Sequence, residues 1–299
     1  MRLITKRQII QALRLRFYKT FVIIVIQRSL LFKKEWEAEM KNLNLFIAVL
    51  MITTIFATSC FAIEAEAILG LWLFDENKGN IVIDSSTNGR NGTIKGDLKW
   101  VKGKFDSALQ FPGQSGNYVM IPHDDGLNVK TFSVTAWVNL VNKGAYQALV
   151  EKSEVAGDVR NFYLAVTLEG QLYGGAKDKG GWNSIIADKI TDEQWHHAAV
   201  TYDMKKILVY LDGKPFSKVA IGAEGGIEPL QNKGPIVIGT TNEAGNEPAQ
   251  GIIDEVGVFK RGLTETEVKA IMQKGLKSSA LAVDSAKKLT ITWGNIKIF

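Results

Sequence analysis

The fold class of this 299-residue chain is decided by residues 194–214, which read QWHHAAVTYDMKKILVYLDGK. The segments 195–203 and 207–211 have the length and the β-branched and aromatic composition of strands. Asp212-Gly213 directly follows the second segment, and this dipeptide tolerates a positive φ at both turn positions. The stretch therefore predicts antiparallel strands that are joined by tight turns.

Short apolar runs of the same kind recur along the chain after residue 67, and they are broken by Gly, Asn and Asp. One helix is indicated, with Thr264 and Glu267 as a capping box and Gly275 as its stop. We therefore expect an all-β fold, an antiparallel sandwich of jelly-roll type with one short C-terminal helix. The further strands are expected at 69–74, 118–121, 132–140, 161–167, 236–239 and 252–259.

Alternation along the predicted strands separates two faces. In 132–140 and 161–167 one face is aliphatic, and we expect it to form the core between two sheets. The opposite face is polar and small, with isolated aromatic residues. Trp137, Tyr163 and His197 all fall on this second face of their strands.

Four motifs in this order and spacing resemble the LamG-like domains of the concanavalin A-like lectin/glucanase superfamily. The resemblance covers about residues 68–277 and implies two curved antiparallel sheets, with one concave face. The motifs are LWLFDE at 71–76 with DSSTNGRNG at 84–92, FSVTAWV at 132–138, QWHHAAVTYD at 194–203 leading into VYLDG at 209–213, and GIIDEVGVF at 251–259 with RGLT at 261–264.

The resemblance implies two activities, sugar binding and glycoside hydrolysis. Glycosidases of the superfamily carry a Glu-x-Asp-x-Glu strand, which holds two carboxyl groups on the concave face. The chain has no such run, because Glu265-Thr266-Glu267 falls in the predicted helix. Asp254 and Glu255 are neighbours in a strand, and we expect them to point to opposite faces. We therefore predict a binding module and not an enzyme.

Sugar binding requires aromatic faces together with polar groups that orient hydroxyls. We predict that Trp137, Tyr163, Trp182 and His197 bind the ligand on the concave face, with Trp182 in a Gly-rich rim loop. For Trp137 the alternative is packing, because it belongs to the family pattern whatever the ligand. His196 and His197 are strand neighbours, so they do not ligate one metal ion together.

The predicted partner is a glycan, and the alternative is an extracellular or envelope protein that is bound without sugar specificity. A glycoside hydrolase with an unrecognised site is the third interpretation. The family resemblance also implies one structural Ca²⁺ where the first strand meets the last. Asp75 and Asp254 occupy the matching motifs, and carboxylate oxygens suit this hard cation. The alternative is that Asp75 caps a turn and Asp254 pairs with a basic group.

Charge and cysteine content exclude several other classes. Residues 1–62 hold ten Lys and Arg against three Asp and Glu, so the remaining chain holds 26 basic and 28 acidic residues. The body is thus near neutral, and nothing in its charge indicates nucleic acid as a partner. Cys60 is the only cysteine, which excludes an intrachain disulfide framework.

From Met40 the chain has the pattern of a secretory signal, with Lys41 before an apolar run and small residues after it. We predict a basic segment at 1–39, upstream of the true start of translation, and a signal peptide or N-terminal anchor at 40–67. The protein is thus expected to be exported, to the periplasm, the cell surface or the medium. It is expected to touch a membrane only through an uncleaved leader or a lipidated Cys60. The domain spans 68–277, and the tail 278–299 is either an edge strand or a docking segment.

Overall fold

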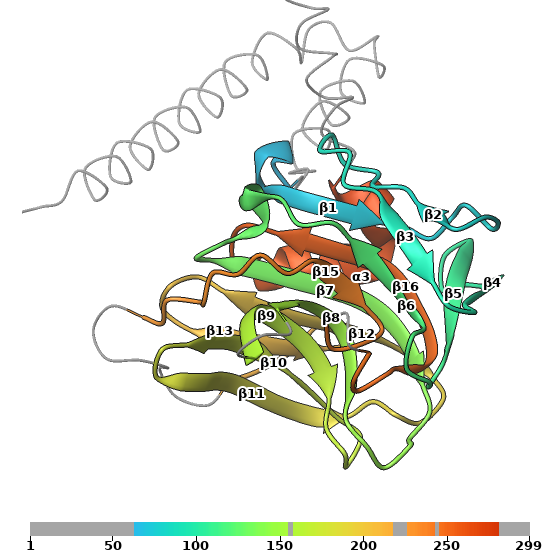
Figure 1. Cartoon of the computed structure of the whole chain (residues 1–299). Coiled ribbons are helices and arrows are strands. Elements are labelled where there is room, and N and C mark those ends of the chain that lie inside the picture. Colours follow the sequence, from blue (N-terminus) through green and yellow to red (C-terminus); the bar gives the residue numbers. More distant parts are fainter. Residues whose placement is uncertain (1–62, 155–157, 218–225, 243–244, 281–299) are drawn as a thin grey trace, which may run out of the picture. The chain divides into compact units, whose positions relative to one another are not determined.

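The structure is a computed structural model that describes residues 63–154, 158–217, 226–242 and 245–280 (Figure 1). The chain divides into two units, Met1–Cys60 and Phe61–Phe299, and every described residue belongs to the second. The predicted signal or anchor up to residue 62, with Cys60, lies outside the described residues, and so does the tail from residue 281. In the part of the chain that is described, no helix is long and apolar enough to cross a membrane.

The described residues form two antiparallel sheets of eight strands each, which confirms the predicted all-β jelly-roll sandwich (Figure 1). The strands of sheet A are β1 (Ile68–Trp72), β4 (Lys99–Lys102), β5 (Ser107–Pro112), β7 (Phe132–Leu140), β12 (Trp195–Tyr202), β13 (Ile207–Leu211), β14 (Lys214–Phe216) and β16 (Gln250–Phe259). Those of sheet B are β2 (Ile81–Val82), β3 (Gly92–Lys95), β6 (Tyr118–Ile121), β8 (Gln147–Glu154), β9 (Val159–Val166), β10 (Gln171–Asp178), β11 (Gly181–Lys189) and β15 (Ile236–Ile238).

The order of strands places distant segments side by side. Sheet A runs β14-β13-β12-β7-β16-β5-β4, and β1 also pairs with β16. Sheet B runs β11-β10-β9-β8-β15-β6-β3-β2. The first and last strands, β1 and β16, are therefore neighbours, whereas β7 and β9 belong to different sheets.

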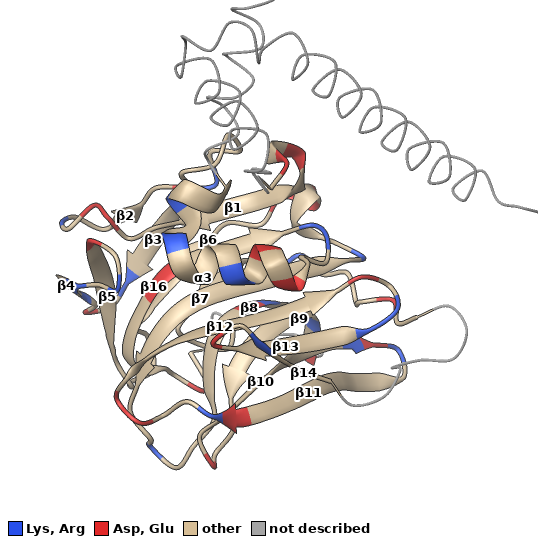
Figure 2. Ribbon diagram, turned by 180° about the vertical axis from the view of Figure 1, so that it is seen from behind, with Lys and Arg blue, Asp and Glu red and all other residues tan. Residues whose placement is uncertain are grey.

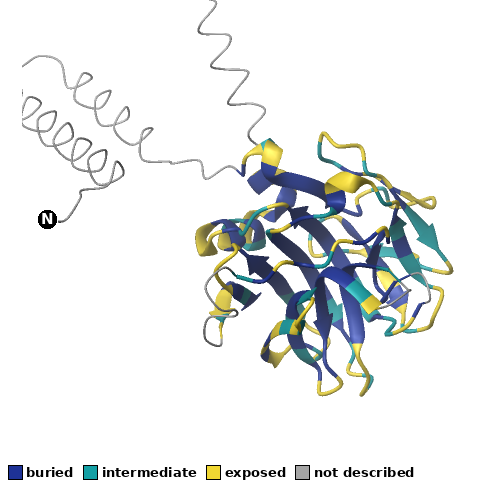
Figure 3. Ribbon diagram, turned by 60° about the vertical axis from the view of Figure 1, so that its left-hand side comes forward, coloured by how far each residue is buried: buried dark blue, intermediate teal, exposed yellow. Residues whose placement is uncertain are grey.

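The hydrophobic core lies between the two sheets, and the predicted aliphatic faces line it. Phe132 and Val134 of β7 meet Phe162 and Leu164 of β9 in one buried cluster. The rings of Phe132 and Phe162 are 5.7 Å apart. Figure 3 shows the buried residues along the strands and the exposed residues mainly in the connecting loops. Burial of these side chains is the main stabilising contribution to such a sandwich.

The predicted turn at Asp212-Gly213 is confirmed. Asp212 has a φ of 50° and Gly213 a φ of 74°, the combination that a two-residue hairpin turn requires. The turn joins β13 to β14, where Leu211 pairs with Lys214. The Asp212 carboxylate also accepts a hydrogen bond of 2.8 Å from the backbone N–H of His197, which ties the turn to β12.

The predicted helix is α3 (Glu265–Ala280), and it covers part of the outer face of sheet A (Figure 2). Its capping box is formed, because the Glu267 carboxylate accepts from the Thr264 N–H at 2.8 Å. Gly275 has a φ of 75°, but it marks a kink and not the end. The helix resumes because Leu276 is anchored beneath it, fully buried against the sheet. Two short 3-10 helices, η1 (Ala65–Ala67) and η2 (Asp125–Leu127), complete the elements.

Candidate functional site

Four aromatic side chains lie together on the outer face of sheet B. Tyr163, Tyr173 and Trp182 stand on β9, β10 and β11, and Tyr146 immediately precedes β8. The ring centroids are 6.0 Å apart for Tyr146 and Tyr173, 5.4 Å for Tyr163 and Tyr173, and 5.3 Å for Tyr163 and Trp182. We call these four residues the aromatic cluster.

Strand alternation and one glycine place this cluster. Phe162 and Leu164 face the core, so Tyr163 between them points outward. Gly175 of β10 is the cross-strand partner of Tyr163. A Cβ at Gly175 would lie 1.9 Å from the carbonyl oxygen of Asn183 on β11, so the position requires glycine. Gly175 therefore places no side chain between Tyr163 and Trp182, whose rings meet across β10.

The cluster has a buried base and an exposed upper part. Tyr163 is completely buried, whereas Trp182 is 47% exposed and Tyr146 is 40% exposed. Each of the three ring pairs is steeply inclined, with interplanar angles of 58° to 78°. Tyr163 thus supports the two rings beside it, and Trp182 offers part of its indole to solvent.

Arg160 and four other charged side chains form a group beside the aromatic cluster. Arg160 Nη1 lies 3.0 Å from Glu151 Oε2, and Arg160 Nε lies 3.0 Å from Asp158 Oδ1. Glu247 Oε2 is 4.0 Å from the same Nη1 atom. Lys177 Nζ lies 3.0 Å from Asp158 Oδ2. We call Glu151, Asp158, Arg160, Lys177 and Glu247 the charged group.

The charged group and the aromatic cluster are in direct contact. The guanidinium carbon of Arg160 is 4.6 Å from the ring centroid of Trp182, and Lys177 Nζ is 5.1 Å from the same centroid. Contacts of this kind between a cation and an indole stabilise both partners. Arg160 and Lys177 therefore hold Trp182 in place while leaving it partly exposed.

Burial shifts the pKa values of this site. Burial of Glu151 raises the pKa of its carboxyl to about 7, and the nearby Arg160 charge opposes this shift. Burial also raises the pKa of Tyr163 to about 12. Near neutral pH the Glu151 carboxyl is therefore close to half protonated, and the Tyr163 hydroxyl stays neutral.

Two buried oxygens of the site lack a well-aligned hydrogen bond among the described residues, Glu151 Oε1 and the Tyr163 hydroxyl. Ser153 and Ser184 lie near enough to lower the pKa values of these two groups. Buried polar groups normally have partners. The face thus combines an exposed aromatic ring with polar atoms that have unused hydrogen-bonding capacity.

The structure does not bring the four predicted ligand-binding residues together. Tyr163 and Trp182 belong to the aromatic cluster on sheet B, whereas Trp137 and His197 stand on β7 and β12 of sheet A. The expectation of one shared face must therefore be corrected. Alternation assigns a residue to one side of its own strand, but it does not say which sheet the strand joins.

Trp137 and His197 form a buried pair on the outer face of sheet A. They are cross-strand partners, and their rings are 5.4 Å apart. Trp137 is 5% exposed and His197 is fully buried. Phe105 packs edge-on at 6.4 Å, and Lys104 Nζ lies 4.1 Å from the Trp137 ring. Burial lowers the pKa of His197 to about 4. The pair is thus covered by the segment before β5.

Asp254 and Glu255 do not point to opposite faces, and that expectation is wrong. The register of β16 against β7 shifts between Asp254 and Gly257, which marks a β-bulge, and Glu255 has a φ of 51°. Ile253 and Val256 on either side face the core. Asp254 accepts from the Phe105 N–H at 3.0 Å, and Glu255 accepts from the Leu276 N–H. Both carboxyl groups therefore lie on the outer face of sheet A.

The two predicted calcium ligands lie in different surroundings. Asp75 is exposed, and its pKa is raised by burial of part of the side chain and by Asp106. Asp254 is fully buried, and burial raises its pKa to about 8. Asp75 helps to raise the pKa of Glu255, whereas it is not a cause of the raised pKa of Asp254. No group of three His, Cys, Asp or Glu among the described residues is placed to hold one ion. Backbone carbonyls would have to complete a calcium site here.

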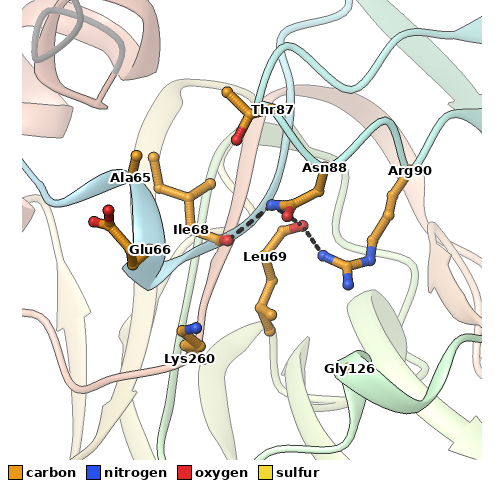
Figure 4. Close-up of a pocket in the computed structure, with 9 residues that line it drawn as sticks. All are labelled: Ala65, Glu66, Ile68, Leu69, Thr87, Asn88, Arg90, Gly126 and Lys260. Carbon is orange, nitrogen blue, oxygen red and sulfur yellow. Dashed lines mark hydrogen bonds between the residues drawn. The ribbon is translucent and has the colours of Figure 1, made fainter.

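Two surface pockets lie away from the aromatic cluster. One, of about 360 Å³, is lined by residues near the start of β1 and is shown in Figure 4. Its main polar groups are already bonded, because Asn88 donates to the Ile68 carbonyl at 2.9 Å and Arg90 donates to that of Leu69 at 2.8 Å. The other, of about 470 Å³, lies near the start of α3. Neither pocket carries exposed aromatic faces like that of Trp182.

Several residues of the site escaped sequence reasoning, namely Tyr146, Glu151, Arg160, Tyr173 and Glu247. For Tyr173 the sequence signal is Gly170, whose φ of 83° allows the tight turn between β9 and β10. That turn pairs Tyr173 with Ala165 and so sets it beside Tyr163. For Glu247, in the loop before β16, the sequence gives no comparable signal.

Comparison with known proteins supports the same fold. The model of the concanavalin A-like lectin/glucanases superfamily matches residues 113–269. No curated protein matches the chain. The binding domain of Paraclostridial Mosquitocidal Protein 1 is similar, with a TM-score of 0.57, 18% identity and coverage of 70% of this chain and 52% of that one.

Two further solved structures are similar and hold sugars. The botulinum neurotoxin serotype D ligand binding domain, in complex with N-acetylneuraminic acid, has a TM-score of 0.56, 15% identity and coverage of 72% of this chain and 52% of that one. Domain 4 of AbnA, a GH43 extracellular arabinanase from Geobacillus stearothermophilus, in complex with arabinotriose, has a TM-score of 0.52, 22% identity and coverage of 69% and 98%. The chain thus spans about half the length of the toxin structures.

Proposed function

The chain belongs to the concanavalin A-like lectin/glucanase superfamily, and from this premise we propose that it is a non-catalytic module that binds carbohydrate at the aromatic cluster of sheet B. One observation carries the proposal. Trp182 is 47% exposed and is held against Tyr163 and Arg160, directly beside the partly exposed side chains of Asp158 and Lys177. A bound sugar requires an exposed aromatic ring beside hydrogen-bonding groups, and this face offers both.

The chemistry of a sugar ring matches the two parts of the site. The C–H faces of a pyranose or furanose pack against an aromatic ring, and the exposed part of the Trp182 indole offers one. Sugar hydroxyls both donate and accept, so they suit the partly exposed carboxylates of Asp158 and Glu247 and the ammonium group of Lys177. A few placed polar groups beside an apolar surface are typical of ligand sites.

The similar structures support binding rather than catalysis. Two of those named above are binding domains, and two hold a bound sugar, arabinotriose and N-acetylneuraminic acid. Glu151 is fully buried and paired with Arg160, and the Glu247 carboxylate accepts from the Thr241 hydroxyl at 2.7 Å. Both carboxyl groups are thus engaged within the protein, and we infer that they orient the ligand rather than cleave it.

We also propose that the module acts outside the cytoplasm and carries one stabilising Ca²⁺. Export follows from the signal pattern that begins at Met40. For calcium, the support is the concentration of acidic groups near β16, where Asp106 helps to raise the pKa of Asp75, and both of these help to raise the pKa of Glu255. Backbone oxygens would supply the other ligands, and the ion would contribute stability and no chemistry.

The decisive experiment is a glycan-array screen of the purified chain and three variants. Trp182→Ala removes the exposed ring, and we expect at least about a ten-fold loss of affinity for the bound glycan. Ile81→Ala is the matched control, because Ile81 is 46% exposed on β2, at the far end of the order of sheet B. Trp137→Phe probes the outer face of sheet A and is expected to leave binding unchanged.

Each outcome of the screen decides between functions. Binding that is lost only in Trp182→Ala supports the sheet B site. Binding that Trp137→Phe abolishes moves the site to sheet A and overturns the proposal. If a folded sample binds no glycan on the array, a protein partner is favoured. A pull-down from the native cell envelope would then identify that partner. Release of reducing ends from the bound glycan would show a hydrolase.

A further inference from the structure

The charged group beside the aromatic cluster holds more carboxylates than cations. Glu151, Asp158 and Glu247 all lie within 4.0 Å of Arg160, and Asp158 also pairs with Lys177. Three carboxyl groups thus share two cations. When all of them are ionised, the group has a net negative charge beside the surface that Trp182 offers.

Both cations are already paired with carboxylates. Arg160 Nε donates to Asp158 and Arg160 Nη1 donates to Glu151, each at 3.0 Å. Lys177 Nζ donates to the Asp158 carboxylate and to the Asp158 carbonyl oxygen, both at 3.0 Å. Both side chains also lie over the Trp182 indole. An incoming carboxylate or sulfate would have to break one of these ion pairs or stay unpaired near three acids.

The polar groups that a ligand can reach suit uncharged partners. The side chain of Asp158 is 49% exposed and that of Glu247 is 30% exposed, whereas that of Arg160 is 10% exposed. A sugar hydroxyl donates to such carboxylate oxygens. A carboxylate of a sugar only accepts, and it would meet Asp158 and Glu247 with like charge.

We infer that the sheet B face selects uncharged glycans over those that carry carboxylate or sulfate groups, and that Asp158 sets this preference by occupying both cations. The inference rests on the proposed function and adds the class of glycan. Asp158 is a specificity-determining residue here because its carboxylate pairs with both Arg160 and Lys177. Specificity of this kind comes from a repulsive element as well as from attractive contacts.

The experiment compares glycans in pairs that differ only in charge. Oligogalacturonides are offered as free acids and as methyl esters, and N-acetyllactosamine is offered with and without terminal sialic acid. The full chain, Asp158→Asn, Glu247→Gln and Asp188→Asn are measured at low and high salt. Asp188 is the matched control, since it lies on β11 and forms only an exposed pair of 3.7 Å with Lys214.

We expect the unaltered chain to bind an uncharged member of a pair about ten-fold more tightly than its acidic counterpart at low salt. Asp158→Asn removes one negative charge and the carboxylate that Arg160 and Lys177 share, so the difference should shrink to about three-fold or less. Glu247→Gln should act in the same direction, whereas Asp188→Asn should change nothing. High salt should also reduce the difference, because salt screens charge.

Tighter binding of the acidic member by the unaltered chain would overturn the inference and leave the proposed carbohydrate function standing. An unchanged preference in both Asp158→Asn and Glu247→Gln, with the circular dichroism spectra intact, would remove the role of the charged group. Absence of binding to every glycan on the array would instead count against the proposed function itself.

Discussion

The guanidinium carbon of Arg160 lies 4.6 Å from the ring centroid of Trp182, although the two residues stand on β9 and β11 with β10 between them. This contact joins a partly exposed aromatic ring to a buried ion pair, because Arg160 also holds Glu151 at 3.0 Å. The position of the Trp182 ring at the surface therefore depends on the Glu151–Arg160 ion pair beneath it. Gly175 of β10, the cross-strand partner of Tyr163, places no side chain between these strands.

Removal of one member of the Glu151–Arg160 pair should destabilise the fold more than replacement of both members by apolar residues. In Arg160→Met the Glu151 carboxyl stays buried without its cation, and the free energy of unfolding should fall by about 3 kcal/mol. In Glu151→Met combined with Arg160→Met the loss should be smaller, because no buried charge is left. Urea unfolding of both variants measures this. If the double variant is less stable than Arg160→Met, the pair contributes net stability and this account is wrong.

Lys152 should be the most sensitive lysine among the described residues. Its fully buried ammonium group donates to the Asn232 side-chain and backbone oxygens at 3.0 and 3.2 Å and to the Gly234 carbonyl at 2.8 Å. Lys152→Met leaves the Asn232 and Gly234 backbone carbonyl oxygens without this donor, and we expect a loss of about 2 to 4 kcal/mol in urea unfolding. The exposed Lys189→Met is the control and should change the midpoint very little.

Stability should fall as the pH rises from 6.5 to 8. Burial raises the pKa of Asp254 to about 8 and that of Glu255 to about 7, so the folded state keeps protons that the unfolded state has already lost. Glu151, with a pKa of about 7, acts in the same direction. His197 has the opposite sign, but it titrates between its lowered pKa of about 4 and its ordinary value of 6.5.

This pH dependence is measured as the melting temperature from pH 6 to 8.5. Asp254→Asn removes the carboxyl with the highest pKa of the three and should flatten the fall. The exposed Asp188→Asn should reproduce the slope of the unaltered chain. A melting temperature that rises with pH over this range would contradict the assignment of protons to these buried acids.

Calcium should stabilise the fold if the predicted site is real. At about 100 times its dissociation constant, the ion should add about 2.7 kcal/mol to the free energy of unfolding. Scanning calorimetry with calcium and with chelator measures this, and Asp75→Asn should remove the difference. Identical melting curves in both conditions would count against calcium and favour the alternative that Asp75 caps a turn.

The pattern of residues along single strands was sufficient for much of the fold. β6, β7 and β13 begin and end where the sequence places them, and the capping box of α3 is formed. By contrast, β8, β10 and β11 are missing from the prediction. β10 carries two adjacent glycines, and β11 exposes apolar Trp182 and Ile186 together with polar residues, so neither has a clear polar–apolar alternation. In β8 seven consecutive residues, polar ones included, are buried.

The sequence by itself determined the all-β class, the sandwich, the hairpin at Asp212-Gly213 and the side of its strand on which Tyr163 lies, because these depend on local alternation and turn geometry. Only the tertiary structure decided that Trp137 and Tyr163 lie on different sheets, and that Arg160 reaches Trp182. It also decided that a bulge turns Asp254 and Glu255 to the same face. The order and register of strands depend on contacts between residues far apart in the chain, and no local pattern specifies them.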